Sequence, residues 1–354
     1  MRRRLLVGIA VLALAAGIGG CSTIGYYYQA ARGHLTIVHD ARPVDAWLAD
    51  PKTPAPLRTR LEAARDIRAF AVRDLGLPDN GSYRSYAELG RPFAVWNVVA
   101  AAEFSTRPRE WCFPVAGCVA YKGWYAERDA DRLAAELRAE GFDAFVHGVP
   151  AYSTLGWFDD PLLSSFLRYP RAEVARLVFH ELAHQVAYAP GDSAFNEAFA
   201  TAVELEGVRR WLARVGSPQE RAEFDAMTLR KRDFVALIQR TRRRLDDLYA
   251  SPFPPDEMRR RKADAFQGMR DDYAALKVSW GGFAGYDRWF AQALGNAHLA
   301  SIGTYEDALP ALDAVLDRLG RDLPKFYEEA RRLAKLDMAE RNRALGIRQD
   351  GERE

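Results

Sequence analysis

The sequence predicts an α+β protein that is predominantly helical. Apolar residues recur at helical spacing near the start of the chain and again over most of its second half, residues 166–350. Runs of strand-like composition are confined to the intervening part, residues 94–149. This distribution predicts a small β-sheet packed beside helices, followed by a largely helical C-terminal lobe.

The first twenty residues have the pattern of an export signal. Three arginines at positions 2–4 precede an apolar run over residues 5–18, which is too short for an ordinary membrane-spanning helix. Two glycines and Cys21 follow, and this junction resembles the bacterial lipobox, where the chain is cut before a cysteine that is then lipidated. We therefore expect residues 1–20 to be removed and Cys21 to anchor the chain to a membrane. A plain N-terminal anchor helix is the alternative.

The residue after the lipobox predicts the compartment. In the usual Gram-negative sorting pattern, a serine such as Ser22 directs a lipoprotein to the outer membrane. We expect the folded body to face the periplasm. The 50 basic and 48 acidic residues nearly balance, and aspartates interrupt the arginine clusters. This pattern is typical of solvated helix faces, so we expect no nucleic-acid partner.

The chain after the signal is interpreted as two lobes, a lipid-anchored α/β lobe over residues 21–165 and a helical lobe over residues 166–350. In the second lobe, one helix begins near Pro170, and a long amphipathic helix ends before Pro252. In the first lobe we predict helices over residues 25–40, 56–75 and 129–140, and strands over residues 94–100, 119–125 and 142–149.

Two cysteines, Cys112 and Cys118, remain once Cys21 is committed to lipid. The residues between them include Pro114 and Gly117, so the segment can turn back on itself. In an oxidising periplasm this spacing predicts a disulfide. A metal site would normally show Cys-x-x-Cys spacing or a neighbouring histidine. Two free buried cysteines are the remaining alternative.

Residues 180–184, HELAH, have the pattern HExxH on a predicted helix. Positions four apart on a helix differ by about 40° in azimuth, so His180 and His184 can both reach one ion. Glu181 lies about 100° from His180 and can lean over the open side of that ion. The spacing suits a tetrahedral zinc with one free position. A helix with two unrelated core or surface histidines is the alternative.

Glu197 lies a short distance downstream of this segment. Capping residues predict a second helix that starts near Asn196 and carries Glu197 in its first turn. We predict Glu197 to be the third zinc ligand; a carboxylate that only faces the helix dipole is the alternative. Thr201 and Glu204 fall on the same face of that helix, so they could orient a ligand histidine.

The segments HELAHQ (residues 180–185) and NEAFA (residues 196–200) together resemble the gluzincin metallopeptidases, in which two HExxH histidines and a downstream helical glutamate bind zinc. More narrowly, the chain after the signal resembles a bacterial family of aminopeptidase lipoproteins, through these segments, WCFPVAGC (residues 111–118) and AYSTLGWFDDP (residues 151–161). The resemblance implies a zincin-like fold, an enzyme with one Zn²⁺ per chain, and a peptide substrate. Residues 166–350 would then form the catalytic lobe.

The reaction of such an enzyme assigns roles to these side chains. Zinc held by His180, His184 and Glu197 would activate a water, and Glu181 would be the general base that takes its proton. The tetrahedral oxyanion needs a further hydrogen-bond donor. The candidates for this donor are Tyr286, His298, Tyr305 and Tyr152.

Gluzincins place a sheet edge across from HExxH, where a peptide can add itself as an extra strand. We assign this edge and the nearby cleft wall to Val149–Phe158, an apolar and aromatic segment that leads toward the zinc helix. Tyr152 or Trp157 would line the substrate pocket. Packing under a loop is the alternative for either ring.

An aminopeptidase also needs a carboxylate that binds the free α-amine of its substrate, for which Glu103, Asp159 and Asp160 are candidates. Exopeptidase activity is implied by the resemblance alone. An envelope metalloendopeptidase would use the same zinc chemistry. A zinc-containing lipoprotein scaffold without enzyme activity is the alternative from another functional class.

Overall fold

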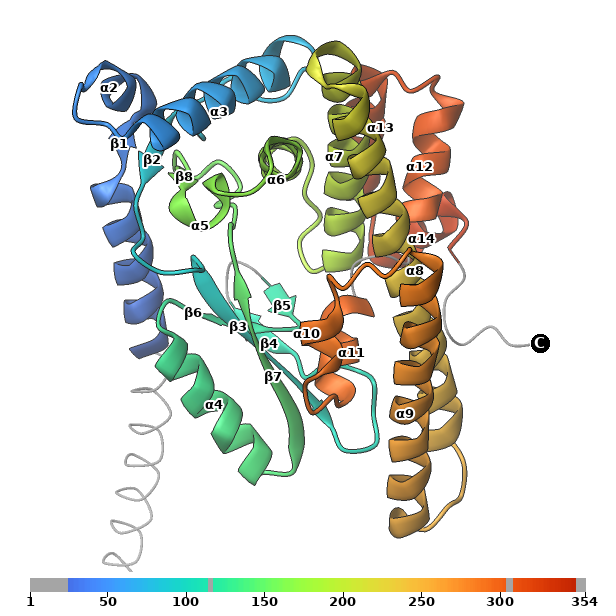
Figure 1. Ribbon diagram of the computed structural model, residues 1–354. Helices are drawn as coiled ribbons and strands as arrows, with labels where there is room; N and C mark the ends of the chain where they lie inside the picture. The colour runs from blue at the N-terminus through green and yellow to red at the C-terminus, as the bar shows by residue number, and fades with distance from the viewer. Residues whose placement is uncertain (1–24, 114–116, 304–307, 348–354) are drawn as a thin grey trace, which may run out of the picture.

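The computed structural model describes residues 25–113, 117–303 and 308–347. The predicted signal over residues 1–20 and the lipidation site Cys21 lie outside these ranges. Most described residues are helical and short strands lie among the helices (Figure 1), which confirms the predicted α+β, predominantly helical class. Within the described ranges, each helix is either too short or too polar to span a bilayer.

The strands lie in the first half of the chain, and helices fill the second half. A helix without a label covers residues 25–40. The labelled helices are α2 (Val44–Ala49), α3 (Ala55–Arg73), α4 (Glu127–Ala139), α5 (Ser164–Leu167), α6 (Arg171–His184), α7 (Ser193–Val215), α8 (Pro218–Tyr249), α9 (Pro255–Ser279), α10 (Asp287–Phe290), α11 (Asn296–Gly303), α12 (Leu309–Arg318), α13 (Leu323–Ala334) and α14 (Met338–Leu345). The strands are β1 (Arg42–Pro43), β2 (Ser85–Ala87), β3 (Val95–Ala102), β4 (Trp111–Phe113), β5 (Gly117–Val119), β6 (Lys122–Trp124), β7 (Phe142–Val149) and β8 (Leu162–Leu163).

The main sheet has β3 at its centre, between β6 and β7, and both neighbours are antiparallel to it. The register pairs Asn97 with Gly123 on one side and with His147 on the other. Successive side chains of a strand point to opposite faces. One face of the sheet packs on α4. The other face packs on α11 through Val99 and Phe145.

The predicted strands over residues 94–100 and 142–149 are confirmed as β3 and β7, and the predicted helices in this part as α3 and α4. The predicted strand over residues 119–125 is divided. Val119 ends β5, where it pairs with Trp111, whereas β6 pairs with β3. Because the two halves have different partners, the chain must turn between them. In the remaining sheet, β2 pairs with β1 and β8.

The hairpin of β4 and β5 contains a disulfide between Cys112 and Cys118, which confirms the predicted bond. The two cysteines lie directly opposite each other in the hairpin register. The disulfide therefore closes a short loop of the kind that the spacing predicts.

The predicted edge strand over Val149–Phe158 is wrong. β7 ends at Val149, and the residues after it form an irregular loop. Leu155 and Gly156 have φ values of 57° and 81°, which lie outside the strand region. The carboxylate of Asp160 accepts hydrogen bonds from the backbone N–H and the hydroxyl of Thr154, at 2.9 and 2.8 Å, and so stabilises the loop.

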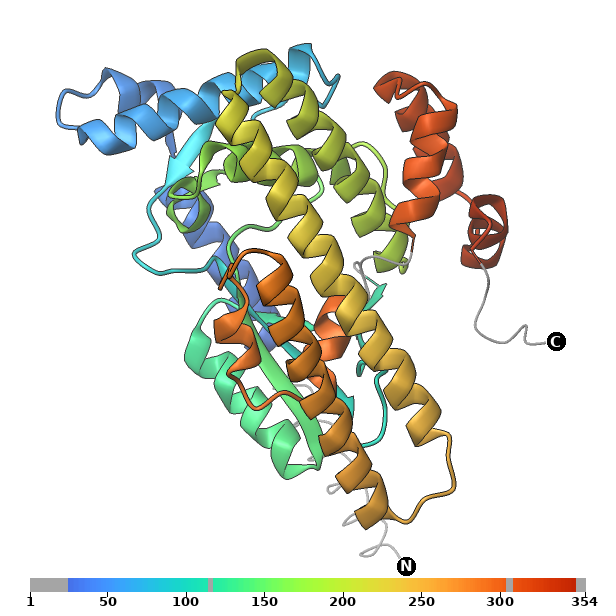
Figure 2. The same cartoon turned by 45° about the vertical axis from the view of Figure 1, so that its right-hand side comes forward.

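The largest hydrophobic cluster joins α3, α6 and α7 to α12 and α13. Gly207 of α7 allows a close approach there, because a Cβ at this position would lie 2.8 Å from Leu75 Cδ1 and 2.9 Å from Phe179 Cδ2. A separate cluster holds α8 against α9, which run side by side in Figures 1 and 2. The largest cluster combines residues from both sides of position 165, and the division into lobes stays a prediction.

α7 begins at Ser193, earlier than the predicted start near Asn196. Asp192 is the N-cap, and its carboxylate accepts a backbone hydrogen bond from the first turn. The side chain of Asn196 instead bonds both backbone groups of Ala189, at 2.7 and 2.9 Å. Glu197 therefore lies beyond the first turn, and the loop before α7 is fixed by both polar side chains.

Arg341 of α14 ties the C-terminal part of the chain to the start of α7. Its guanidinium forms an ion pair with Asp192, and both side chains are buried. It also donates to the backbone carbonyls of Leu333 at 3.0 Å and Leu336 at 2.6 Å. Removal of one partner from a buried pair leaves the other charge uncompensated.

We predict that Arg341→Met destabilises the protein by about 3 to 5 kcal/mol, because Asp192 then stays buried without its counter-ion. Urea unfolding measures the change as a lower midpoint at unchanged slope. The double variant Arg341→Met/Asp192→Ser removes both charges and keeps a capping hydroxyl, so it should recover most of the loss. A single variant as stable as the parent would contradict a structural role for the pair.

Candidate metal centre

The candidate ligands come from two consecutive helices that pack against each other. His180 and His184 lie one turn apart at the C-terminal end of α6, and Glu197 lies near the N-terminal end of α7. Figure 1 shows α6 nearly end-on beside the upright α7. The structure places one ligand atom of each residue within 4.8 Å of the others. The sequence prediction had grouped the same three residues.

The distances among these atoms suit a tetrahedral zinc site. His180 Nε2 lies 3.2 Å from His184 Nε2 and 3.2 Å from Glu197 Oε2, and His184 Nε2 lies 3.7 Å from Glu197 Oε1. Two atoms that are each bound at about 2.0–2.1 Å to a tetrahedral zinc are about 3.3 Å apart. In addition, two imidazole lone pairs that face each other at this distance repel unless a proton or a metal ion lies between them.

The second nitrogen of His180 is fixed by Glu204. His180 Nδ1 lies 2.8 Å from Glu204 Oε2, and Arg176 Nη1 lies 3.2 Å from both oxygens of the same carboxylate. Burial opposes ionisation of Glu204, yet Arg176 and His180 together lower its pKa to about 2. An ionised carboxylate only accepts hydrogen bonds, so Nδ1 of His180 carries the proton. His180 Nε2 then faces Glu197 and His184, where a metal ion would take the place of a second proton.

The charges around His180 favour a cation at this point. Burial alone would lower the pKa of His180, but its hydrogen bonds to Glu197 and Glu204 raise the pKa to about 10. Burial, together with the positive charge on His180, lowers the pKa of His184 to about 4. His184 is therefore neutral, the form in which imidazole binds metals. Its Nδ1 is buried and has no hydrogen-bond partner among the described residues.

Glu181 lies next to the ligands without belonging to the group. The residue is only 9% exposed. Burial raises the pKa of Glu181 to about 7; the positive charge on His180 lowers it, and Glu197 raises it. A carboxylate with a pKa near neutrality can both accept and donate a proton under physiological conditions. The backbone carbonyl of Glu181 accepts a hydrogen bond from Ser153 Oγ at 3.4 Å.

Two residues predicted to stabilise the oxyanion are placed elsewhere. Tyr286 stacks on Phe234 at 4.2 Å between ring centroids, within the cluster of α8 and α9. His298 stacks on Phe145 at 4.1 Å, and its Nδ1 accepts a hydrogen bond from Gly295 N at 3.1 Å. Both side chains thus pack on elements other than α6 and α7. The structure does not bring either of them together with the ligand group.

The remaining predicted aromatic residues are divided among several places. Tyr152 is half-buried, and its hydroxyl lies 2.9 Å from His34 Nδ1. Trp157 is 78% exposed on the loop after β7. Tyr305 lies outside the described residues. Thr201 is on α7, but Glu204 is the residue of that helix that accepts the hydrogen bond from His180 Nδ1.

The three carboxylates considered for the substrate amine differ in their surroundings. Glu103 pairs with Arg259 at 2.6 Å on the surface. Asp159 packs against Gly81 and is exposed. Asp160 is buried and is bonded to Thr154, and its charge contributes to the raised pKa of Glu181. Of the three, Asp160 is the one that acts electrostatically on the predicted base.

Three further residues near the candidate ligands were not predicted from the sequence. Arg176 lies one turn before His180 on α6, so its spacing was a usable signal. Tyr188 lies in the loop between α6 and α7, and the charge of Glu197 contributes to its raised pKa. Burial raises the pKa of Tyr121, and the charges of Glu197 and Glu181 raise it further. Tyr121 comes from the β5–β6 connection, so no local pattern could have found it.

Comparisons with known proteins assign the chain to one family. Residues 25–345 match the family described as "Putative aminopeptidase". No curated protein matches the chain. No solved structure matches it either.

Removal of the carboxylate behind His180 should weaken metal binding. We predict that Glu204→Gln lowers the affinity for Zn²⁺ about 10- to 100-fold, because His180 Nδ1 loses a charged partner that fixes its tautomer. Competition with a chromophoric chelator measures this change. Thr201→Ala, one turn earlier on the same helix, is the matched control and should bind Zn²⁺ like the parent. Equal weakening in both variants would contradict the assignment.

Proposed function

Because the chain belongs to the putative aminopeptidase family, we propose that it is a zinc-dependent peptidase of the gluzincin type that removes residues from the N-terminus of peptides. The observation that supports the zinc site is the convergence of His180, His184 and Glu197 at distances that suit a tetrahedral ion. The family supports peptidase activity, and the three-residue group supports the metal.

Zinc bound by these three residues would polarise the substrate carbonyl and lower the pKa of a water toward neutrality. The protein moves the proton. Glu181 accepts it from the attacking water and later gives it to the amine that leaves. Burial of Glu181 supports this role, because it raises the pKa of the carboxyl to about 7. Glu204 and Arg176 keep the His180 ring in one orientation throughout.

We assign the donor that stabilises the oxyanion to Tyr121. An oxyanion forms between the general base and the metal ligands, so its donor must lie near both. The charges of Glu181 and Glu197 both act on the Tyr121 hydroxyl, whereas of these two only Glu197 acts on Tyr188. This assignment replaces Tyr286 and His298, which pack on other elements.

We also propose that the protein is a lipoprotein of the bacterial outer membrane, anchored through Cys21, whose folded body faces the periplasm. The lipobox-like sequence supports the anchor. The disulfide between Cys112 and Cys118 supports an oxidising compartment.

Replacement of the general base should separate metal binding from turnover. Glu181→Gln is expected to bind one Zn²⁺ per chain like the parent and to lose about 10²- to 10⁴-fold in kcat, because an amide cannot accept the proton of the water. Zinc analysis and a peptide hydrolysis assay on the same sample measure the two properties. Full activity in a zinc-loaded variant would exclude Glu181 as the base.

A blocked peptide distinguishes the proposed aminopeptidase from its alternatives. The parent should release residues one after another from a peptide with a free N-terminus and leave the N-acetylated peptide intact, as mass spectrometry of a time course would show. Internal cleavage of the acetylated peptide would instead support an envelope metalloendopeptidase. Zinc-loaded protein that cuts neither peptide would support a scaffold without enzyme activity.

A further inference from the structure

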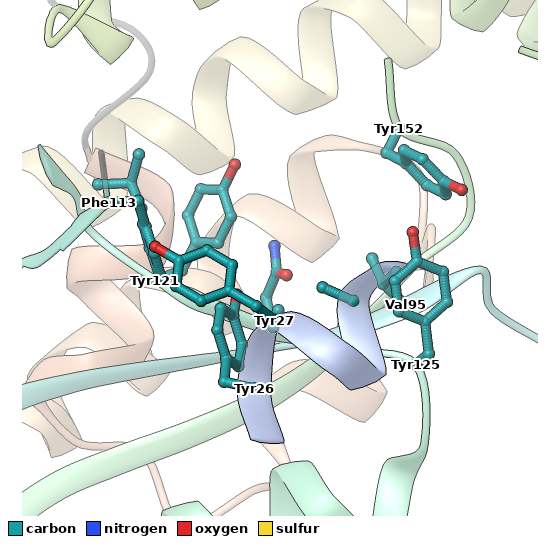
Figure 3. A pocket seen from close by; sticks show the side chains of 11 residues that line it. Tyr26, Tyr27, Val95, Phe113, Tyr121, Tyr125 and Tyr152 are labelled. Atoms are coloured by element: carbon teal, nitrogen blue, oxygen red, sulfur yellow. The ribbon is translucent and has the colours of Figure 1, made fainter. Parts of the chain in front are cut away.

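A cavity of about 400 Å³ lies between the main sheet and the helix over residues 25–40. Figure 3 shows Tyr26, Tyr27 and Phe113 on one side of it and Tyr125 and Tyr152 on the other. Val95 of β3 lies beside Tyr125. The cavity therefore has two aromatic walls.

The described residues that line this cavity carry no charged side chain. Aromatic rings make up most of the wall; Tyr26 stacks on Phe113 at 5.4 Å, and Tyr125 meets Tyr152 edge to face at 6.0 Å. Burial raises the pKa of Tyr26 to about 12, so its hydroxyl stays neutral. Such a wall favours a bulky uncharged group, and it disfavours a charged group that would lose its hydration without gaining a counter-ion.

Both walls contact α6 or the loop between α6 and α7, the two helices that carry the candidate ligands. Tyr152 precedes Ser153, whose hydroxyl bonds the backbone of Glu181. On the other side, Val119 of β5 lines the cavity. Gly117 at the start of β5 packs against Gly191, because a Cβ added at Gly117 would lie 3.5 Å from the backbone nitrogen of Gly191. Gly191 belongs to the loop that connects the two metal helices. The cavity thus lies beside the candidate metal centre.

Tyr121 lines the cavity and is also within the electrostatic influence of the candidate ligand Glu197. It also packs against Val99 and α11 on the inner face of the sheet. The charges of Glu197 and Glu181 act on its hydroxyl. A group that fills the cavity therefore lies next to Tyr121, the residue on whose hydroxyl Glu197 and Glu181 act.

The wall of the cavity that the helix over residues 25–40 forms is fixed to the main sheet by specific contacts. Gln29 occupies the open edge of β6, because its amide nitrogen bonds Gly123 O at 3.4 Å and its oxygen accepts from Tyr125 N at 3.1 Å. Gly33 lies directly against the Tyr125 ring, where an added Cβ would clash. These contacts hold Tyr26 and Tyr27 in place over the cavity.

We propose that this cavity is the side-chain subsite of the peptidase and that it selects a bulky uncharged side chain, aromatic above all, at one of the two positions that flank the cleaved bond. The proposal rests on the proposed function. The helix over residues 25–40, which directly follows the predicted anchor, would then determine part of the substrate specificity.

A pair of neighbouring substitutions tests the subsite. Ala30 lines the cavity, whereas Ala31 is exposed on the same helix and does not. Zinc-loaded full-length protein would be assayed on Phe-Gly, Gly-Phe, Ala-Gly, Gly-Ala, Glu-Gly and Gly-Glu amides. The parent should prefer Phe over Ala at one position by about 10-fold or more, which corresponds to burial of the ring. Glu at that position should be the poorest of the three.

Ala30→Trp should lower kcat/KM for the preferred Phe peptide at least about 10-fold and leave the matching Ala peptide within about 2-fold, because the added indole fills the cavity. Ala31→Trp should behave like the parent. If Ala30→Trp does not fold, Tyr27→Ala, which removes part of the wall, should reduce the preference for Phe instead. The subsite would be wrong if Phe and Ala peptides were cleaved at equal rates, if Glu were preferred, or if the two tryptophan variants had equal effects. None of these outcomes would contradict the peptidase activity itself.

Binding without turnover separates this proposal from the function on which it rests. Calorimetry on zinc-loaded Glu181→Gln protein should show that the preferred Phe peptide binds at least about 10-fold more tightly than its Ala counterpart, and that Ala30→Trp removes the difference. If the parent cleaves nothing but this binding pattern holds, the subsite stands and the peptidase proposal falls. If neither peptide binds better than the other, the subsite is wrong.

Discussion

Two carboxylates, the buried Glu204 and the partly buried Glu197, lie within hydrogen-bonding distance of a single imidazole, that of His180. Two negative charges at one buried place are costly unless positive charge balances them. Arg176 balances Glu204, and the proposed metal ion between His180, His184 and Glu197 would balance the second charge. The rest of the site follows from this arrangement, because it fixes the tautomer of His180 and keeps Glu181 in a neighbourhood that is both buried and negative.

The rest of the fold holds α7 in the position from which Glu197 and Glu204 both reach His180. Glu197 and Glu204 lie two helical turns apart and reach the same ring, so a small shift of α7 along its axis would lose both contacts. The start of α7 is held by Asp192 with Arg341 and by Asn196 with Ala189. The C-terminal helices α12 and α13 pack on the same core as α6 and α7. The main sheet and the helix over residues 25–40 come from the N-terminal half of the chain and line the neighbouring cavity.

Much of the ligand group was predictable because its members are close in the chain. His180, Glu181 and His184 share one helix, so helical geometry alone brings them together, and Glu197 comes from the next helix, which packs against the first. The disulfide between Cys112 and Cys118 was predictable for the same reason. The strands β3 and β7 and the helices α3 and α4 were also local patterns of apolar residues.

The sequence by itself therefore predicted the class of the fold, the disulfide and the grouping of His180, His184 and Glu197. Only the tertiary structure decided which aromatic side chains lie near them. Tyr286 and His298 were candidates from the sequence and Tyr121 was not, but the first two pack on other elements, whereas the charge of Glu197 acts on Tyr121. The loop after β7 likewise depends on Asp160 and on positive φ angles rather than on strand propensity. Contacts between segments far apart in the chain are set by packing, which periodicity does not encode.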